Sequence, residues 1–261
     1  MGGSGSGAIS RFGRYNPLFY RAGGARGSGG FIGYQFSSRF RVDGGYLAIG
    51  ASFDPNSGLF GSNYTGFLLM SINPISNLEI GVGGAYAYND ASGGGINLAG
   101  GTGTDFAGNP FLTLPVFGSG QGERVHFPTA NFMFRWRVLP KFTLAGWFGY
   151  GWARGESDRP PAGGMFQGTR QSNILTGALQ FLFPEPLNRK GDMGGLIIGV
   201  PPYVTANQWS GFPIPGGTTS GSQGSRKLNY RDTSLPLHLE LFYRFQVTEK
   251  RRKALHFRAG M

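Results

Sequence analysis

The chain has 261 residues, of which 48 are Gly, with 15% aromatic residues, only 14% charged residues and a formal charge of +11 at pH 7. Gly at this level usually accompanies disorder, but the aromatic content excludes that class, because disordered chains are poor in aromatic residues. The absence of Cys excludes a disulfide framework and a thiolate metal site. The basic residues are scattered apart from a cluster at 250–253, whereas a nucleic-acid-binding protein concentrates them on one face.

Nine segments alternate apolar residues with small or polar ones, and a period of two predicts β-strands whose two faces meet different surroundings. In chain order these segments are 28–36, 39–52, 63–72, 77–89, 131–138, 141–155, 172–183, 192–204 and 235–247. The last of them has apolar residues at every odd position and carries His238, Glu240 and Arg244 at even positions. It is much longer than the usual strand of a globular protein, which has about 5 or 6 residues.

The links between these segments alternate between short and long. The short links are 37–38, 73–76, 139–140 and 184–191, and the long ones are 53–62, 90–124, 155–169 and 205–232. Outer-membrane barrels have short periplasmic turns and long external loops. The two patterns together predict an all-β, antiparallel transmembrane β-barrel, whose apolar face meets lipid and whose polar face lines a watery lumen. A large soluble barrel or a β-helix is the alternative.

The sequence also indicates whether the chain forms a whole barrel or part of one. No run of about 18 apolar residues is present, so we expect no transmembrane helix, and the first residues lack the apolar core of a secretory signal. Bacterial barrels have an even number of strands, and nine is odd. We therefore interpret the chain as a piece of a larger barrel, with an outer-side loop segment at 1–27, a barrel segment at 28–248 and a basic tail at 249–261. A frameshift, a truncated gene or a solvated tail would each explain the basic residues at the end.

Four stretches carry a resemblance to a known family. They are "AISRFGRYNPLFYR" (8–21), "FTLAGWFGYGWAR" (142–154), "GGLIIGVPPYVT" (194–205) and "DTSLPLHLELFYRFQVT" (232–248). They resemble the carbohydrate-selective porin (OprB) family, in its cyanobacterial branch of iron-uptake porins with S-layer-homology domains, over roughly residues 8–248. The resemblance implies a channel of about sixteen strands in the bacterial outer membrane. It also implies a homotrimer, and permeation of sugars or of inorganic ions, including iron species.

The alternation predicts which side chains line the lumen. These are Arg39, Arg41, Asp43, Glu79, Arg135, Arg137, Lys141, Trp147, His238, Glu240 and Arg244. Six of them are cationic and three are anionic, which favours anions, or sugar hydroxyls bound by Arg donors and by stacking on Trp147 or Phe242. The alternative is that these residues only keep the wall wet and pair with one another.

A pore requires no catalysis. The three His residues lie far apart, without a nucleophile pattern or a paired carboxylate, so we expect neither an enzyme nor a cofactor or metal. The expected partners are outer-membrane lipid and small hydrophilic solutes, and no nucleic acid. Two alternatives are a non-conducting barrel that anchors surface loops and a basic RNA-binding β protein. The Gly-rich loop at 90–124 either folds inward to narrow the pore or is a flexible external loop.

Overall fold

The structure is a computed structural model that describes residues 8–24, 27–48, 63–89, 97–110, 124–155, 171–209, 217–220, 228–232 and 234–246. The strands are β1 (Ser28–Gln35), β2 (Phe40–Ala48), β3 (Tyr64–Ile75), β4 (Leu78–Asn89), β5 (Val125–Leu139), β6 (Phe142–Gly155), β7 (Gln171–Pro184), β8 (Met193–Trp209), β9 (Gly217–Ser220), β10 (Leu228–Asp232) and β11 (His238–Arg244). The helical elements are α1 (Arg11–Arg14), α2 (Pro17–Tyr20), η1 (Ala22–Gly24) and α3 (Asp105–Gly108). No helix in the described ranges has the length and apolar character needed to cross a lipid bilayer.

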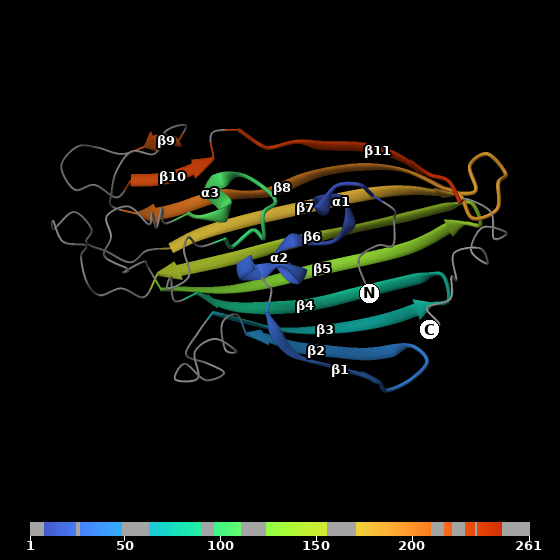
Figure 1. Ribbon diagram of the computed structural model, residues 1–261, viewed down its shortest axis with the longest axis horizontal. Helices are drawn as coiled ribbons and strands as arrows, with labels where there is room; N and C mark the ends of the chain where they lie inside the picture. Colours follow the sequence, from blue (N-terminus) through green and yellow to red (C-terminus); the bar gives the residue numbers. More distant parts are fainter. Residues whose placement is uncertain are drawn as a thin grey trace, which may run out of the picture.

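All the strands belong to one antiparallel sheet (Figure 1). Strands β1 to β8 pair in sequence order, and the far edge of the long strand β8 pairs with β11 at one end and with β10 at the other. Among the described strands, β1 pairs only with β2 and β11 pairs only with β8, so the described sheet is open at both of these edges. The all-β, antiparallel class expected from the sequence is confirmed.

Each of the nine expected strands is present, and the largest difference in their bounds is at β5. The alternation predicted this strand from Asn131, but it begins six residues earlier, at Val125. The earlier half contains Pro128, which lacks the N–H that a central strand donates and therefore lowers the strand signal. The sheet accommodates it with a local break, because the β5–β6 ladder passes directly from His126–Arg154 to Thr129–Gly151.

Prolines also shorten β11. The alternation begins at Leu235, but the strand itself begins at His238, three residues after the start of the pattern. Pro236 cannot donate to the ladder, and the next residues of β8 beyond the Gly199 partner of His238 include Pro201 and Pro202. Within the long link predicted at 205–232, the sheet gains the two short strands β9 and β10. Neither has the alternation that identified the other nine.

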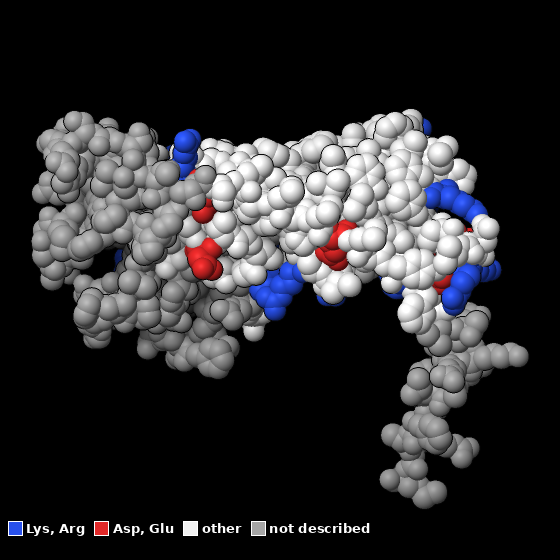
Figure 2. All heavy atoms as spheres, turned by 90° about the horizontal axis from the view of Figure 1, so that it is seen from above, with Lys and Arg blue, Asp and Glu red and all other residues white. Residues whose placement is uncertain are grey.

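The two faces of the sheet differ as the alternation predicted. One face, here called the apolar face, presents large side chains that are exposed, such as Leu68 at 52%, Phe148 at 47% and Leu241 at 80%. The opposite face, here called the polar face, is lined by residues such as Thr129 and Gln180, which are buried. In Figure 2, the described surface is mostly uncharged over its broad upper part, and charged side chains gather at the ends and along the lower margin. The buried side chains of the sheet therefore lie on its polar face.

The end of β11 is fixed by a carboxylate in the β7–β8 turn. Asp192 accepts hydrogen bonds from the hydroxyl of Tyr243 and from the backbone N–H of Gln246 (2.9 Å), and it forms an ion pair with Arg189 (3.4 Å). The hydrogen bond from Tyr243, followed by the one from Gln246, lowers the pKa of Asp192 below its ordinary value. The negative charge of Asp192 therefore stabilises the folded sheet at neutral pH.

This arrangement predicts a pH-dependent effect of Asp192→Asn. A depressed carboxyl pKa adds stability above the unfolded value of about 3.9 and loses it as the pH falls through the folded value. We expect thermal melts followed by circular dichroism to show a lower Tm for the variant at pH 7 and a difference that closes as the pH falls below about 4. The control Glu185→Gln, in the same turn, should leave Tm almost unchanged, because Glu185 accepts one long hydrogen bond there, of 3.4 Å from Gly191. A Tm difference between Asp192→Asn and the native protein that persists undiminished at pH 3 would contradict this role.

Candidate functional site on the polar face

The strand register places the expected lumen residues on the polar face. Arg41 and Asp43 lie on β2, Glu79 lies opposite Arg135 in the β4–β5 register, and Trp147 lies opposite Met133. His238, Glu240 and Arg244 share one side of β11 with the buried Phe242. Arg39 and Lys141 lie in the short turns at the ends of these strands. The predicted residues that lie on strands therefore share a face, although they are spread along its length.

Two of the three expected anions are paired with cations on this face. Arg41 donates to Asp43 through both Nε and Nη2, with a shortest distance of 2.6 Å. Arg135 Nη2 donates to Glu79 Oε2 across β4 and β5 at 2.7 Å. These contacts neutralise two positive charges and leave one expected anion, Glu240, and four expected cations, namely Arg39, Arg137, Lys141 and Arg244. Lys141 donates to the neutral side chain of Asn188, so its charge is retained.

A segment that the sequence placed in an outer-side loop lies across the polar face. Residues 8–24, here called the strap, contain α1, α2 and η1 and pass over the sheet from β11 toward β3 (Figure 1). Ser10 caps α1 by accepting from the N–H of Gly13 at 2.8 Å. Asn16 caps α2 by accepting from the N–H of Leu18 at 3.1 Å, with Pro17 in the first turn. Both caps favour a helix start at these positions.

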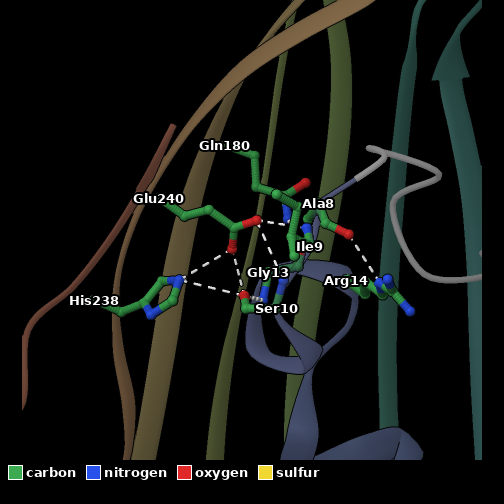
Figure 3. Close-up of polar contacts among 8 residues, drawn as sticks. All are labelled: Ala8, Ile9, Ser10, Gly13, Arg14, Gln180, His238 and Glu240. Carbon is green, nitrogen blue, oxygen red and sulfur yellow. Dashed lines mark hydrogen bonds and ion pairs between the residues drawn. The ribbon is translucent and has the colours of Figure 1, made fainter. Parts of the chain in front are cut away.

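The first end of the strap is held by β11 and β7 (Figure 3). Glu240 Oε1 accepts from the backbone N–H of Ile9 at 2.6 Å, and Glu240 Oε2 accepts from the hydroxyl of Ser10. His238 Nε2 lies 3.2 Å from Glu240 Oε2 and 3.3 Å from Ser10 Oγ. Gln180 Nε2 on β7 donates to the carbonyl of Gly13 at 2.6 Å. Glu240, the third expected anion, is thus used to hold the strap.

The middle of the strap is held by a buried polar network on β5. Asn16 Nδ2 donates to Asn131 Oδ1 at 2.9 Å, and Asn131 Nδ2 donates to Thr129 Oγ1 at 2.9 Å. Thr129 in turn donates to the carbonyl of Leu18 at 2.8 Å. All four residues are at least 95% buried. Hydrogen bonds inside such a buried network are stronger than in water, and each partner depends on the others.

The far end of the strap reaches β3. Thr65 Oγ1 donates to the carbonyl of Ala22 at 3.0 Å. Tyr20 lies near the acidic groups of β2 and β4, and burial, followed by the negative charges of Asp43 and Glu79, raises its pKa to about 12. The Tyr20 hydroxyl is therefore neutral at physiological pH.

The strap covers Trp147, which the sequence suggested as a stacking platform. The ring of Phe12 meets Trp147 edge-on at 5.5 Å and His238 edge-on at 4.9 Å. Trp147 is 6% exposed and Phe242 is 4% exposed. In this arrangement neither Trp147 nor Phe242 presents its ring to solvent, so stacking on a sugar would have to involve other side chains.

Part of the 90–124 loop packs against the strap and β8. In its described range, 97–110, Leu98, Ala99 and Ala107 are fully buried. The N–H of Gly23 donates to the carbonyl of Leu98 at 3.2 Å, and the N–H of Thr104 donates to the carbonyl of Pro202 at 2.9 Å. These contacts agree with the inward alternative for this part of the loop, and the rest of the loop, 90–96 and 111–123, lies outside the described residues. The basic tail at 249–261 also lies outside them.

Aromatic side chains form two rows at opposite ends of the apolar face. At the end with the long loops, the rings of Tyr46, Tyr64, Tyr88 and His126 follow one another across β2 to β5 with centroid distances of 5.1–5.6 Å. Tyr150 and Trp152 of β6 extend this row. The row at the short-turn end consists of Tyr34, Phe36, Phe40, Trp136, Phe142, Phe183 and Tyr243. Among the described residues, no group of three His, Asp or Glu side chains is arranged to hold a metal ion.

Comparison with known proteins gives one informative relative. The chain is similar to Uncharacterized protein sll0772 of Synechocystis sp. (strain ATCC 27184 / PCC 6803 / Kazusa), with 28% identity over 257 residues. The match covers 93% of this chain and 40% of the relative, so the chain spans less than half the length of that curated protein. No protein-family model matches the chain, and no solved structure matches it.

Proposed function

We propose that the sheet is part of the wall of a β-barrel in the bacterial outer membrane, which lets small hydrophilic solutes diffuse passively along the polar face. The observation that carries the proposal is the apolar face. Between its two aromatic rows, strands β2 to β7 place only uncharged residues on this side, and the large ones among them are exposed or partly exposed, with none buried. An exposed apolar surface of this extent indicates a lipid or protein environment. Aromatic rows at both borders favour lipid, since Trp and Tyr gather at membrane interfaces.

The height of the uncharged band supports a bilayer. On β5, His126 lies in one aromatic row and Trp136 lies in the other, ten residues further along. At about 3.3 Å per residue this distance is about 33 Å along the strand. For strands tilted by about 40°, the band is about 25 Å tall, which is the height of the apolar band of outer-membrane barrels.

The open edges of the sheet require partners in such a membrane. Backbone N–H and C=O groups have no water to bond inside the hydrocarbon, so only closed barrels are stable there. The proposal therefore includes further strands that pair with β1 and β11. The chain resembles carbohydrate-selective porins, which have about sixteen strands, and this resemblance supports the presence of additional strands. The relative's greater length also leaves room for them, since the match covers 40% of it.

The charge of the polar face predicts selectivity for anions or for solutes that accept hydrogen bonds. Asp43 and Glu79 are paired, whereas Arg137 and Arg244 have no acidic partner among the described residues, so the net charge along the described part of the face is positive. In a planar bilayer with a KCl gradient, we expect a reversal potential whose sign shows that Cl⁻ permeates better than K⁺. A reversal potential with the sign of cation selectivity would contradict this assignment.

The segments that occupy the polar side favour a second function, that of a barrel which anchors surface loops without conducting. The strap and residues 97–110 both occupy the polar side, which is the arrangement expected of a filled barrel that only anchors surface loops. Conductance separates the two functions. Discrete current steps from the native protein support the pore, and a membrane-inserted protein without any current supports the anchor.

A further inference from the structure

Two arginines of the strap meet one turn of the loop segment 97–110, which lies beside the strap on the same side of the sheet (Figure 1). Arg21 follows α2, and its Nε lies 3.1 Å from the position that a Cβ atom of Gly100 would occupy. Arg11 begins α1, and its Nη1 lies 3.5 Å from the corresponding position of Gly101. The two guanidinium groups therefore reach consecutive residues of the same turn.

The turn is held by Asn97, which also brings a third donor to this place. Asn97 Oδ1 accepts from the N–H of Gly101 at 2.9 Å, and the carbonyl of Asn97 accepts from the N–H of Gly100 at 3.3 Å. Asn97 Nδ2 lies 3.9 Å from the same Gly101 position that Arg11 approaches. Gly100 is buried and Gly101 is exposed, so the place where these N–H groups meet is open to solvent on one side.

The hydrogen-bonding capacity of the two arginines is unused. Arg21 Nε is buried and has no hydrogen-bond partner, and within the described ranges neither the Arg11 nor the Arg21 guanidinium forms a hydrogen bond or an ion pair. Buried polar groups almost always have a partner, which is protein, ordered water or an ion. A buried donor that belongs to a positive charge is costly unless an acceptor reaches it. The arrangement therefore fits a ligand that accepts hydrogen bonds and carries negative charge.

The surrounding carboxylates do not supply this acceptor. The strap contains no Asp or Glu, and the loop segment 97–110 contains one, Asp105, which is exposed and pairs with neither arginine. On the sheet below, Asp43 and Glu79 are each bound to an arginine of their own or of the neighbouring strand. The groups that meet at the turn are therefore N–H donors, and the planar fork of a guanidinium matches the oxygens of a phosphate.

We propose that Arg11, Arg21 and Asn97 form a binding site for a small tetrahedral oxyanion of the phosphate type. The arginines supply the charge and most of the N–H groups, and Asn97 supplies a neutral donor. The site lies on the polar face, so its ligand is an ion dissolved in water rather than a lipid headgroup. The inference goes beyond the proposed function and holds for a conducting barrel and for an anchor alike.

Titration of the full chain in detergent with inorganic phosphate, followed by phosphorus NMR at constant ionic strength, tests the site. We expect saturable binding to the native protein. Arg11→Gln and Arg21→Gln should each weaken it at least about tenfold, because hydrogen bonds to charged groups are among the strongest. Asn97→Asp should weaken it by a similar factor, because it keeps the acceptor for the N–H of Gly101 but replaces the donor with a carboxylate.

Lys190→Gln is the matched control, because it also removes one positive charge but lies in the exposed β7–β8 turn. Its affinity should stay within about twofold of the native value, since salt screens distant exposed charges. Circular dichroism checks the folding of each variant, and Asn97→Asp, which retains the turn, tests the site even where Arg21→Gln loosens the strap.

Three results would overturn the inference. They are no saturable binding to the native protein, equal losses in Lys190→Gln and in the site variants, and tighter binding of glycerol phosphate, the headgroup chemistry of a phospholipid, than of inorganic phosphate. A native protein that binds phosphate at this site but conducts no current would instead overturn the proposed transport function and leave this inference standing.

Discussion

Replacing Leu68 with Arg should lower the free energy of unfolding from lipid vesicles by about 2–4 kcal/mol, the cost of a basic side chain on the lipid face near the bilayer midplane. Leu68 lies on the apolar face of β3, four residues from Tyr64 in the aromatic row. At about 3.3 Å per residue and a tilt of about 40°, it lies about 10 Å below that row, near the middle of the band. Denaturant titration of the vesicle-bound protein, followed by Trp fluorescence, measures this change.

The matched control is Ile75→Arg on the same strand. Ile75 is 53% exposed and Leu68 is 52% exposed, so the two positions differ in depth and hardly at all in exposure. At the end of the strand the same substitution should cost only about 0–1 kcal/mol. In a soluble protein both changes would fall within about ±0.5 kcal/mol, as surface substitutions do. Equal, small effects at the two positions would therefore contradict the membrane assignment and favour a soluble β protein.

Replacing Asn131 with Ala should destabilise the protein by about 1–3 kcal/mol, because it leaves a buried amide without its partner. Asn131 is 3% exposed and accepts from Asn16 Nδ2, which is itself on a buried side chain. After the substitution, the remaining acceptor near this donor is the carbonyl of Phe148, at 3.5 Å. Denaturant titration gives the loss, and protease cleavage within residues 8–24 shows whether the strap is released.

Asn77→Ala serves as the control for this effect. The side chain of Asn77 donates one hydrogen bond, to the carbonyl of Arg137 at 3.0 Å, but unlike Asn131 it is exposed, in the β3–β4 turn. Water replaces an exposed partner, so the expected change is within about 0.5 kcal/mol. If Asn131→Ala were as mild as Asn77→Ala, or if it left the strap as resistant to protease as before, the strap would not depend on the β5 network.

The two-faced sheet could be predicted from the sequence because the side-chain period of a strand is two. In β4, for example, Ile80 and Val82 alternate with Gly81 and Gly83, and the register confirms that these pairs lie on opposite faces. The polar face of β11 was predicted in the same way from His238, Glu240 and Arg244. The beginning of β5 was missed, because Pro128 interrupts the pattern that a central strand normally shows.

The strap could not be predicted from alternation, since it contains no strand. Its contacts join residues far apart in the sequence, such as Ser10 with Glu240 and Asn16 with Asn131, and no local pattern encodes such pairs. A local signal was nevertheless present. Ser10 and Asn16-Pro17 are helix-start residues placed just before the short apolar runs that become buried. Read in this way, the segment would have been expected to fold back onto the sheet.

Fluorescence quenching by brominated lipids tests the central claim most directly. Single-Trp variants retain Trp136, Trp152 or Trp147 and carry Phe at the other positions, including Trp209. Trp136 and Trp152 lie on the apolar face at 40% and 37% exposure, and Trp147 lies under the strap at 6%. Bromine on the acyl chains should quench Trp136 and Trp152 strongly and leave Trp147 bright. No quenching of Trp136 and Trp152 would show that lipid does not cover the apolar face, and strong quenching of Trp147 would show that lipid reaches the polar face; either result would contradict the account.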